Sequence, residues 1–183
     1  MNNGESSYRR FLDGDESAFD EILKEYRNSL TFFIDRYVHD IDAAEDIAID
    51  VFTEVIVHPH RYNFKTTLKT YLFMIGRSRA LDYIKHKKKI IFSELEEADK
   101  LVDEHSSLEE IVLADERKHI LNMAIAKLPE NMELVVHLVY FENLSYEETA
   151  KVMKKNVKQI DNLLYRAKKE LRSILGKEGE LLI

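Results

Sequence analysis

The chain has 183 residues, a formal net charge of -7, no cysteine, no tryptophan, 5 glycines and 2 prolines. The lack of cysteine excludes a disulfide framework, a thiolate nucleophile and a cysteine-ligated zinc or iron–sulfur site. So few glycines and prolines disfavour the tight turns of an all-β fold and favour a helical one. The N-terminal stretch lacks a basic flank followed by an apolar run, and no apolar stretch approaches the ~20 residues that cross a bilayer, so we expect a soluble, cytoplasmic protein with no direct membrane insertion.

Charge is distributed unevenly along the chain. Residues 1–60 carry 5 basic and 14 acidic side chains, whereas residues 61–90 carry 9 basic side chains and one acidic one. Residues 91–116 hold 1 basic and 10 acidic side chains, and residues 154–183 hold 8 basic and 4 acidic ones. Two basic stretches separated by an acidic one suit a protein that contacts a polyanion at two places, although such runs are equally common on solvated helix faces.

Apolar residues at three- and four-residue spacing predict three helices in the first half of the chain. The first covers residues 16–38. The second begins at a capping box formed by Asp42 and Glu45 and ends at Pro59. A polar, aromatic and basic loop, HPHRYNFKTTLK, follows, and the third helix then begins near Leu68 and runs into the lysine cluster at residues 86–89.

The second half of the chain is predicted to form a linker followed by four helices. Residues 90–106 lose the periodicity and gather Glu and Asp. Capping boxes predict three helix starts, at Ser107 with Glu110, Ser145 with Glu148, and Asn156 with Gln159. A further helix is predicted over about residues 132–141. We therefore expect an all-α chain with two small helical domains, residues 1–89 and 107–176, joined by the acidic linker 90–106 and followed by a tail, 177–183.

The strongest local motif is SYEETAKVMKKNVKQIDNLLYRAKKELRSIL. A short helix, a break and a longer helix, with the small residue Ala150 where two helices can cross closely, have helix-turn-helix spacing. The outward face of the second helix consists of Lys155, Lys158, Gln159, Asn162, Tyr165, Arg166 and Lys169. Such a face suits a DNA major groove, because Gln and Asn pair with adenine and Lys and Arg with guanine or phosphate. A helical hairpin with a solvated basic face is the alternative, because the turn has Lys154 at a position where glycine would relieve backbone strain.

A second motif, RYNFKTTLKTYLFMIGRSRALDYIKHKKK, interleaves aromatic, basic and hydroxyl residues. Rings can stack on unpaired bases and cations can hold the backbone, so this pattern predicts single-strand binding. The cations of this path are Arg61, Lys65, Lys69, Arg77, Arg79, Lys85 and Lys87. Tyr62 and Phe64 are better stacking candidates than Tyr71 and Phe73, whose helical spacing is typical of core residues.

Together these motifs resemble a small alternative sigma factor of bacterial RNA polymerase, from the extracytoplasmic-function group of the sigma-70 family. AAEDIAIDVF resembles the polymerase-binding segment of region 2, and LKTYLFMIGRSRALDYIKHKKK resembles its minus-ten segment. LPENMELVVHLVYFENLSYEETAKVM and NVKQIDNLLYRAKKEL resemble region 4, which reads the minus-thirty-five element. The chain departs from the family pattern at Ile49, Tyr71, Ser78, Asp161 and Leu163. These differences affect the expected promoter sequence more than the expected function.

The resemblance also implies partners and site residues. Region 2 is expected to dock on the β′ clamp helices of core RNA polymerase through Glu45, Asp46, Ile49, Asp50 and Glu54. The expected minus-ten contacts are Tyr62, Phe64 and the cations named above, together with Asn63, Thr67, Tyr71 and Ser78. Region 4 is expected to dock on the β flap and read promoter DNA, and the linker to thread the polymerase's RNA channel. An anti-sigma factor that masks both DNA-binding blocks is a further expected partner, in a bacterial cytoplasm, and no cofactor is expected.

Two other functions fit parts of the sequence. A helix-turn-helix regulator could bind duplex DNA without polymerase, but it leaves the aromatic and basic loop without a purpose. A metal-dependent enzyme could use His58 and His60 as neighbouring ligands, but no clear third ligand accompanies them.

Overall fold

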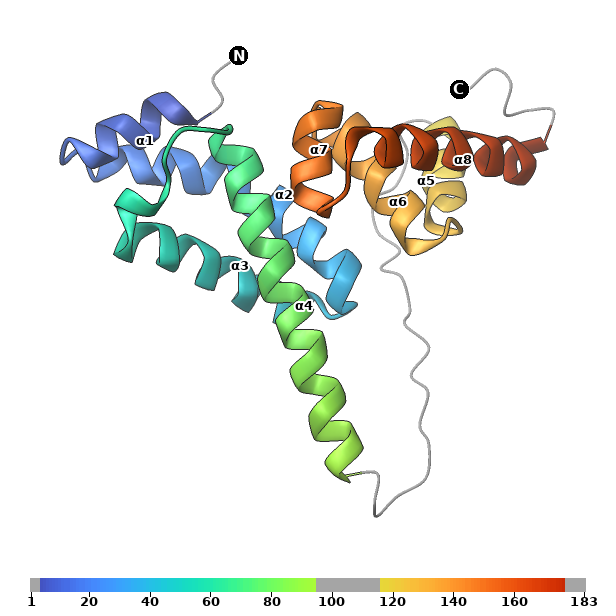
Figure 1. Cartoon of the computed structure of the whole chain (residues 1–183), viewed down its shortest axis with the longest axis horizontal. Coiled ribbons are helices and arrows are strands. Elements are labelled where there is room, and N and C mark those ends of the chain that lie inside the picture. The colour runs from blue at the N-terminus through green and yellow to red at the C-terminus, as the bar shows by residue number, and fades with distance from the viewer. Residues whose placement is uncertain (1–3, 95–115, 177–183) are drawn as a thin grey trace. The chain divides into compact units, whose positions relative to one another are not determined.

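The computed structural model describes residues 4–94 and 116–176, and these residues contain helices and no strand, which confirms the predicted all-α class. The chain divides into two compact units, residues 1–104 and 105–183. Unit 1 contains α1 (Glu5–Leu12), α2 (Ser17–Val38), α3 (Ile41–Val57), a 3₁₀ turn (Pro59–Arg61) and α4 (Leu68–Glu94) (Figure 1). No helix in the described residues has both the length and the apolar character that membrane crossing requires.

The central helix of unit 1 is α2, which packs against α1, α3 and α4. Its apolar stripe is buried and consists of Phe19, Ile22, Tyr26, Leu30, Phe33, Ile34 and Tyr37. The predicted helix at residues 16–38 is therefore confirmed. Helix α4 approaches α2 closely at Gly76, where an added Cβ atom would lie 2.9 Å from Cδ1 of Leu30.

The start of α3 differs from the predicted capping box of Asp42 and Glu45. The N-cap is Asp40, whose carboxylate accepts a hydrogen bond of 3.1 Å from the backbone N–H of Ala43. Asp42 lies in the first turn instead, where a negative charge suits the helix dipole. The prediction was wrong by two residues because two aspartates flank Ile41 and only their backbone geometry distinguishes them.

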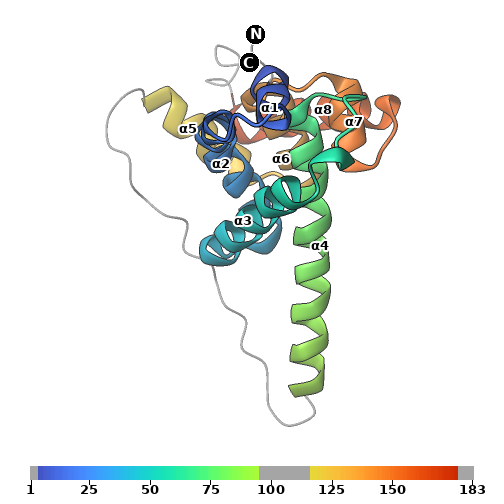
Figure 2. The ribbon, with the colours of Figure 1, turned by 90° about the vertical axis from the view of Figure 1, so that its left-hand side faces the viewer.

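Helix α4 begins after Thr67, whose hydroxyl accepts a hydrogen bond of 3.2 Å from the N–H of Thr70. It continues to Glu94, so residues 90–94, predicted as the start of the linker, are helical. Its C-terminal half projects beyond α2 and α3 (Figures 1 and 2). The rest of the predicted linker, the Ser107–Glu110 capping box and the predicted tail lie outside the described residues.

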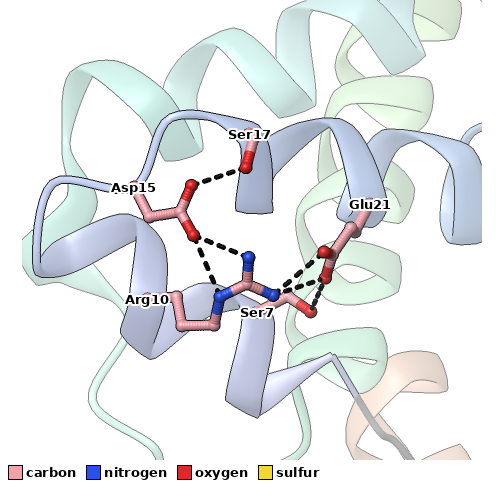
Figure 3. A network of polar contacts seen from close by, with 5 residues as sticks. All are labelled: Ser7, Arg10, Asp15, Ser17 and Glu21. Carbon is pink, nitrogen blue, oxygen red and sulfur yellow. Dashed lines mark hydrogen bonds and ion pairs between the residues drawn. The ribbon is translucent and has the colours of Figure 1, made fainter.

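Helix α1 was not predicted, because it spans 8 residues and no side chain caps its start at Gly4. A polar network holds it against the beginning of α2 (Figure 3). The Arg10 guanidinium donates to Asp15 at 2.6 Å and to Glu21 at 2.9 Å. Ser7 donates to the same Glu21 carboxylate at 2.8 Å, and Ser17 donates to Asp15 at 2.6 Å.

Unit 2 contains α5 (Glu116–Ala126), α6 (Glu130–Val136), a π-helical turn (His137–Phe141), α7 (Tyr146–Met153) and α8 (Val157–Leu175). The predicted helix at residues 132–141 is thus α6 followed by the π-helical turn. Both predicted capping boxes at Ser145 and Asn156 are confirmed. The fully buried side chains of this unit include Leu134, Leu138, Ile160 and Leu164.

Candidate polymerase and nucleic-acid interfaces

The loop between α3 and α4 is shaped by two local hydrogen bonds. The side-chain oxygen of Asn63 accepts from the N–H of Lys65 at 3.1 Å, in an Asx turn that accompanies a left-handed backbone at Phe64 (φ 59). The hydroxyl of Tyr62 donates to the carbonyl of Thr66 at 2.6 Å. These bonds fix which side chains the loop presents.

Tyr62 was predicted as a stacking surface for bases, and the structure contradicts this. Its side chain is only 3% exposed, so no base can reach its ring. The Tyr62 ring packs against Tyr71 at 5.1 Å between centroids and against Tyr8 at 5.2 Å. Burial is also the main reason why the pKa of Tyr62 is raised. Tyr62 therefore supports the loop from inside.

Phe64 in the loop and Tyr71 in the first turn of α4 are half-buried, so part of each side chain remains at the surface. The Phe64 ring lies 4.6 Å from that of Tyr62, and the Arg9 guanidinium lies over it, 4.2 Å from the ring centroid. Arg9 belongs to α1 and was not predicted as a site residue. The only sequence signal for it was the Tyr-Arg-Arg-Phe run at residues 8–11.

Several predicted DNA-contacting cations have carboxylate partners. Arg61 and Arg79 both pair with Glu54, at 2.9 and 2.6 Å. Glu54 had been assigned to polymerase docking, but both its oxygens are engaged within unit 1. The hydrogen bond from Arg79, followed by that from Arg61, holds the pKa of Glu54 below its usual value.

The other members of the predicted minus-ten set lie along the loop and α4. The Lys85 ammonium lies 3.7 Å from the Asp82 carboxylate, and the Lys87 ammonium lies 3.8 Å from the Asp40 carboxylate. The exposed members include Asn63, Lys65 and Ser78, and the half-buried ones include Thr67, Lys69 and Arg77.

The predicted polymerase-docking residues on α3 form an exposed face. Glu45, Asp46 and Asp50 are exposed, and Ile49 between them is 52% exposed. Residues one helical turn apart share a face, so acidic groups surround an accessible apolar side chain. This arrangement suits a partner surface that is basic around an apolar centre.

The helix-turn-helix consists of α7, a turn at Lys154, and α8. Lys154 has a left-handed backbone (φ 52), so this turn has the backbone strain that glycine would relieve. Ala150 is buried, 6% exposed, as its small size between two helices suggested. The predicted outward residues of α8 are exposed, including Tyr165 at 71%, except that Lys155, which precedes α8, is half-buried.

Gln159 has a structural role that the outward face alone did not reveal. Its side-chain oxygen accepts from the N–H of Asn156 at 2.9 Å, and the Asn156 side chain accepts from the N–H of Gln159 at the same distance. The Gln159 side-chain oxygen is thus already engaged once, so bidentate pairing with adenine requires it to accept a second hydrogen bond or the cap to open. Asp161 is exposed on α8 as well.

Comparisons with known proteins identify a family for both units. Residues 22–90 match the family model of sigma-70 region 2, and residues 118–171 match that of sigma-70 region 4. The ECF RNA polymerase sigma factor SigM of Bacillus subtilis is 27% identical over 163 residues, covering 87% of this chain and 96% of SigM. The RNA polymerase sigma-H factor of Pseudomonas aeruginosa is 26% identical, covering 88% of each chain.

A solved structure shares the fold. The sigma factor RpoE in complex with the anti-sigma factor NepR, from Bartonella quintana, matches with a TM-score of 0.63 and 20% identity, covering 87% of this chain and 97% of that one. The chain belongs to the sigma-70 family, in its extracytoplasmic-function group. It is an alternative sigma factor that directs RNA polymerase to promoters, and such factors initiate transcription without being enzymes.

Proposed function

We propose that the chain divides its work between its two units as follows: residues 1–89 dock on the polymerase and hold the melted minus-ten strand, and residues 107–176 read the minus-thirty-five element. The observation that carries this proposal is the pairing of an exposed acidic and apolar helix face with an aromatic and basic loop in unit 1. A regulator that binds only duplex DNA needs neither feature.

Polymerase docking is assigned to Glu45, Asp46, Ile49 and Asp50 on α3. The three carboxylates are exposed and suited to basic side chains on the β′ clamp helices. The Ile49 side chain offers apolar area that a partner can bury. Glu54 is assigned a different role, because it pairs with Arg61 and Arg79.

Minus-ten contacts are assigned to the surface around the loop at residues 60–69 and to the basic side of α4. Unstacking a base costs a few kcal/mol, and trapping that base on a planar side chain offsets the cost. Phe64 and Tyr71 are the partly exposed planar groups available for this task, Lys65 adds a cation for the DNA backbone, and Tyr62 supports the loop from inside.

Minus-thirty-five readout is assigned to α8, with Asn162 and Arg166 as base-reading candidates and Lys158 and Lys169 as phosphate contacts. Docking of this unit on the β flap completes the attachment. We also propose an anti-sigma factor as a partner, by analogy with the Bartonella complex, and action in the cytoplasm of a bacterium without a cofactor.

The test is association with core RNA polymerase followed by run-off transcription on genomic fragments. Reversing charge with Asp46→Lys and Asp50→Lys is expected to weaken association about tenfold or more while leaving helix content unchanged. Asp20→Lys, which alters an exposed carboxylate on α2, is the matched control and is expected to behave as the unaltered chain.

Two results would overturn this proposal. Unchanged association of the double variant would show that this α3 face is not the dock. A chain that binds a promoter duplex specifically by itself, and does not join core polymerase, would instead be a helix-turn-helix regulator.

A further inference from the structure

Arg9 covers the ring that was expected to receive a base. Its guanidinium lies 4.2 Å from the Phe64 centroid, and the rings of Tyr62 and Tyr8 lie 4.6 and 6.1 Å from the same ring. A base cannot stack on the face of Phe64 that Arg9 occupies. Arg9 itself is exposed, so the planar group that this position presents to solvent is the guanidinium.

Helix α1 holds Arg9 in place with respect to the loop. The neighbouring Tyr8 is fully buried, and its hydroxyl donates to the carbonyl of Pro59 at 2.7 Å, which ties α1 to the start of the loop. Gly4 at the beginning of α1 lies so close to α2 that an added Cβ would be 2.7 Å from the Tyr26 ring. The Arg10 network fastens the other end of α1 (Figure 3).

We propose that Arg9 is a base-stacking residue of the single-strand site, with an unpaired base of the melted strand lying on the outer face of its guanidinium. The order of the stack is then Phe64, Arg9 and base. Guanidinium planes are established stacking surfaces for splayed bases, and the charge also favours the adjacent phosphate. This inference rests on the proposed role of the loop in holding the melted strand, and it adds α1 to that site.

The test uses holoenzyme assembled from the full chain and core polymerase, on a promoter fragment found by run-off transcription. One version of the fragment has an unpaired minus-ten strand, created by mismatches, and the other is a closed duplex studied at low temperature. Arg9→Ala is expected to weaken binding of the unpaired version about tenfold and of the closed duplex less than twofold. Arg9→Lys keeps the charge but not the plane, so its loss is expected to approach that of Arg9→Ala.

Two comparison variants separate stacking from charge and from fold. Arg27→Ala removes an exposed arginine on α2 and is expected to bind both fragments as the unaltered chain does. Lys65→Ala removes a loop cation and is expected to reduce the salt dependence of binding without the selective loss on unpaired DNA. Circular dichroism of each variant checks that helix content is retained, as the exposure of Arg9 leads us to expect.

The outcomes separate this inference from the function on which it rests. If Arg9→Ala binds unpaired DNA normally while Phe64→Ala or Tyr71→Ala does not, Arg9 is not a stacking residue and the loop site stands. Full binding by Arg9→Lys would likewise overturn stacking, leaving only a charge contact. If none of the variants at Arg9, Phe64, Lys65 and Tyr71 affects unpaired DNA, the loop is not the single-strand site and both proposals fail.

Discussion

The carboxylate of Glu54 joins three elements of unit 1, because it lies on α3 and pairs with Arg61 of the 3₁₀ turn and Arg79 of α4. Only 20% of its side chain is exposed, so solvent screens these pairs less than it would on an open surface. Its pKa in the folded chain lies below the ordinary value of 4.5, through the hydrogen bonds from Arg79 and then Arg61. The stabilisation is therefore fully present above that ordinary value and is lost as pH falls through the folded pKa.

We predict that Glu54→Gln lowers the free energy of unfolding of unit 1 by about 1 kcal/mol at neutral pH. The difference from the unaltered chain should shrink towards zero at acidic pH, where the carboxylate is protonated in both states. Amide hydrogen exchange of the α2 core, corrected for intrinsic rates, measures this quantity in the full chain. Glu45→Gln, an exposed position on the same helix, is the control, and a Glu54→Gln deficit that persists unchanged in acid would contradict the ion-pair explanation.

The turn between α7 and α8 offers a test at the level of the element. Lys154 holds φ 52, a left-handed conformation that costs a residue with a Cβ atom about 1 kcal/mol, whereas glycine adopts it freely. We predict that Lys154→Gly raises the stability of unit 2 by about 0.5 kcal/mol, since the added freedom of the unfolded chain offsets part of the gain. Hydrogen exchange of α8 provides the measurement.

The matched control for this turn is Lys151→Gly. Lys151 is exposed on α7 with helical backbone, so glycine there should lower stability by about 1 kcal/mol. Opposite signs for two lysine-to-glycine changes three residues apart would follow from backbone conformation alone. The same sign for both would mean that the turn geometry does not limit the stability of the helix-turn-helix.

The elements with regular apolar stripes or complete capping boxes were predictable from sequence, and the irregular ones were not. Helix α2 and the starts of α7 and α8 follow directly from spacing and cap chemistry. Helix α1 is short and lacks a capping side chain, and the π-helical turn follows α6 without any residue that marks it. Sequence alone therefore missed α1 and, with it, Arg9.

The sequence could nominate residues for the candidate site, but it could not show which of their side chains are accessible. The aromatic spacing could not show that Tyr62 faces inward while Phe64 stays at the surface, because an Asx turn sets that difference. On α8, Gln159 belongs to both the outward face and the predicted capping box, and the structure shows that its side-chain oxygen is engaged in the cap. In both places a local hydrogen bond decides what a side chain can still contact.

At the scale of the whole molecule, each unit has a core of its own. Phe33 and Leu72 are buried in unit 1, and Leu134 and Leu164 are buried in unit 2. Under the proposed division of roles, two units that each bind DNA modestly gain affinity from their connection, because binding of the first raises the effective concentration of the second to about the millimolar range. The connection should thus matter for transcription more than for folding.

We predict that a chain divided between residues 104 and 105 yields two fragments that each retain helical circular dichroism. Mixed at about micromolar concentration with core polymerase, they should support run-off transcription about a hundredfold or more below the intact chain, because each must now find the polymerase separately. Raising the concentration of both fragments should restore part of the activity. Full activity at micromolar concentration would mean that each unit binds the polymerase tightly by itself, and loss of helix in either fragment would contradict the two-core description.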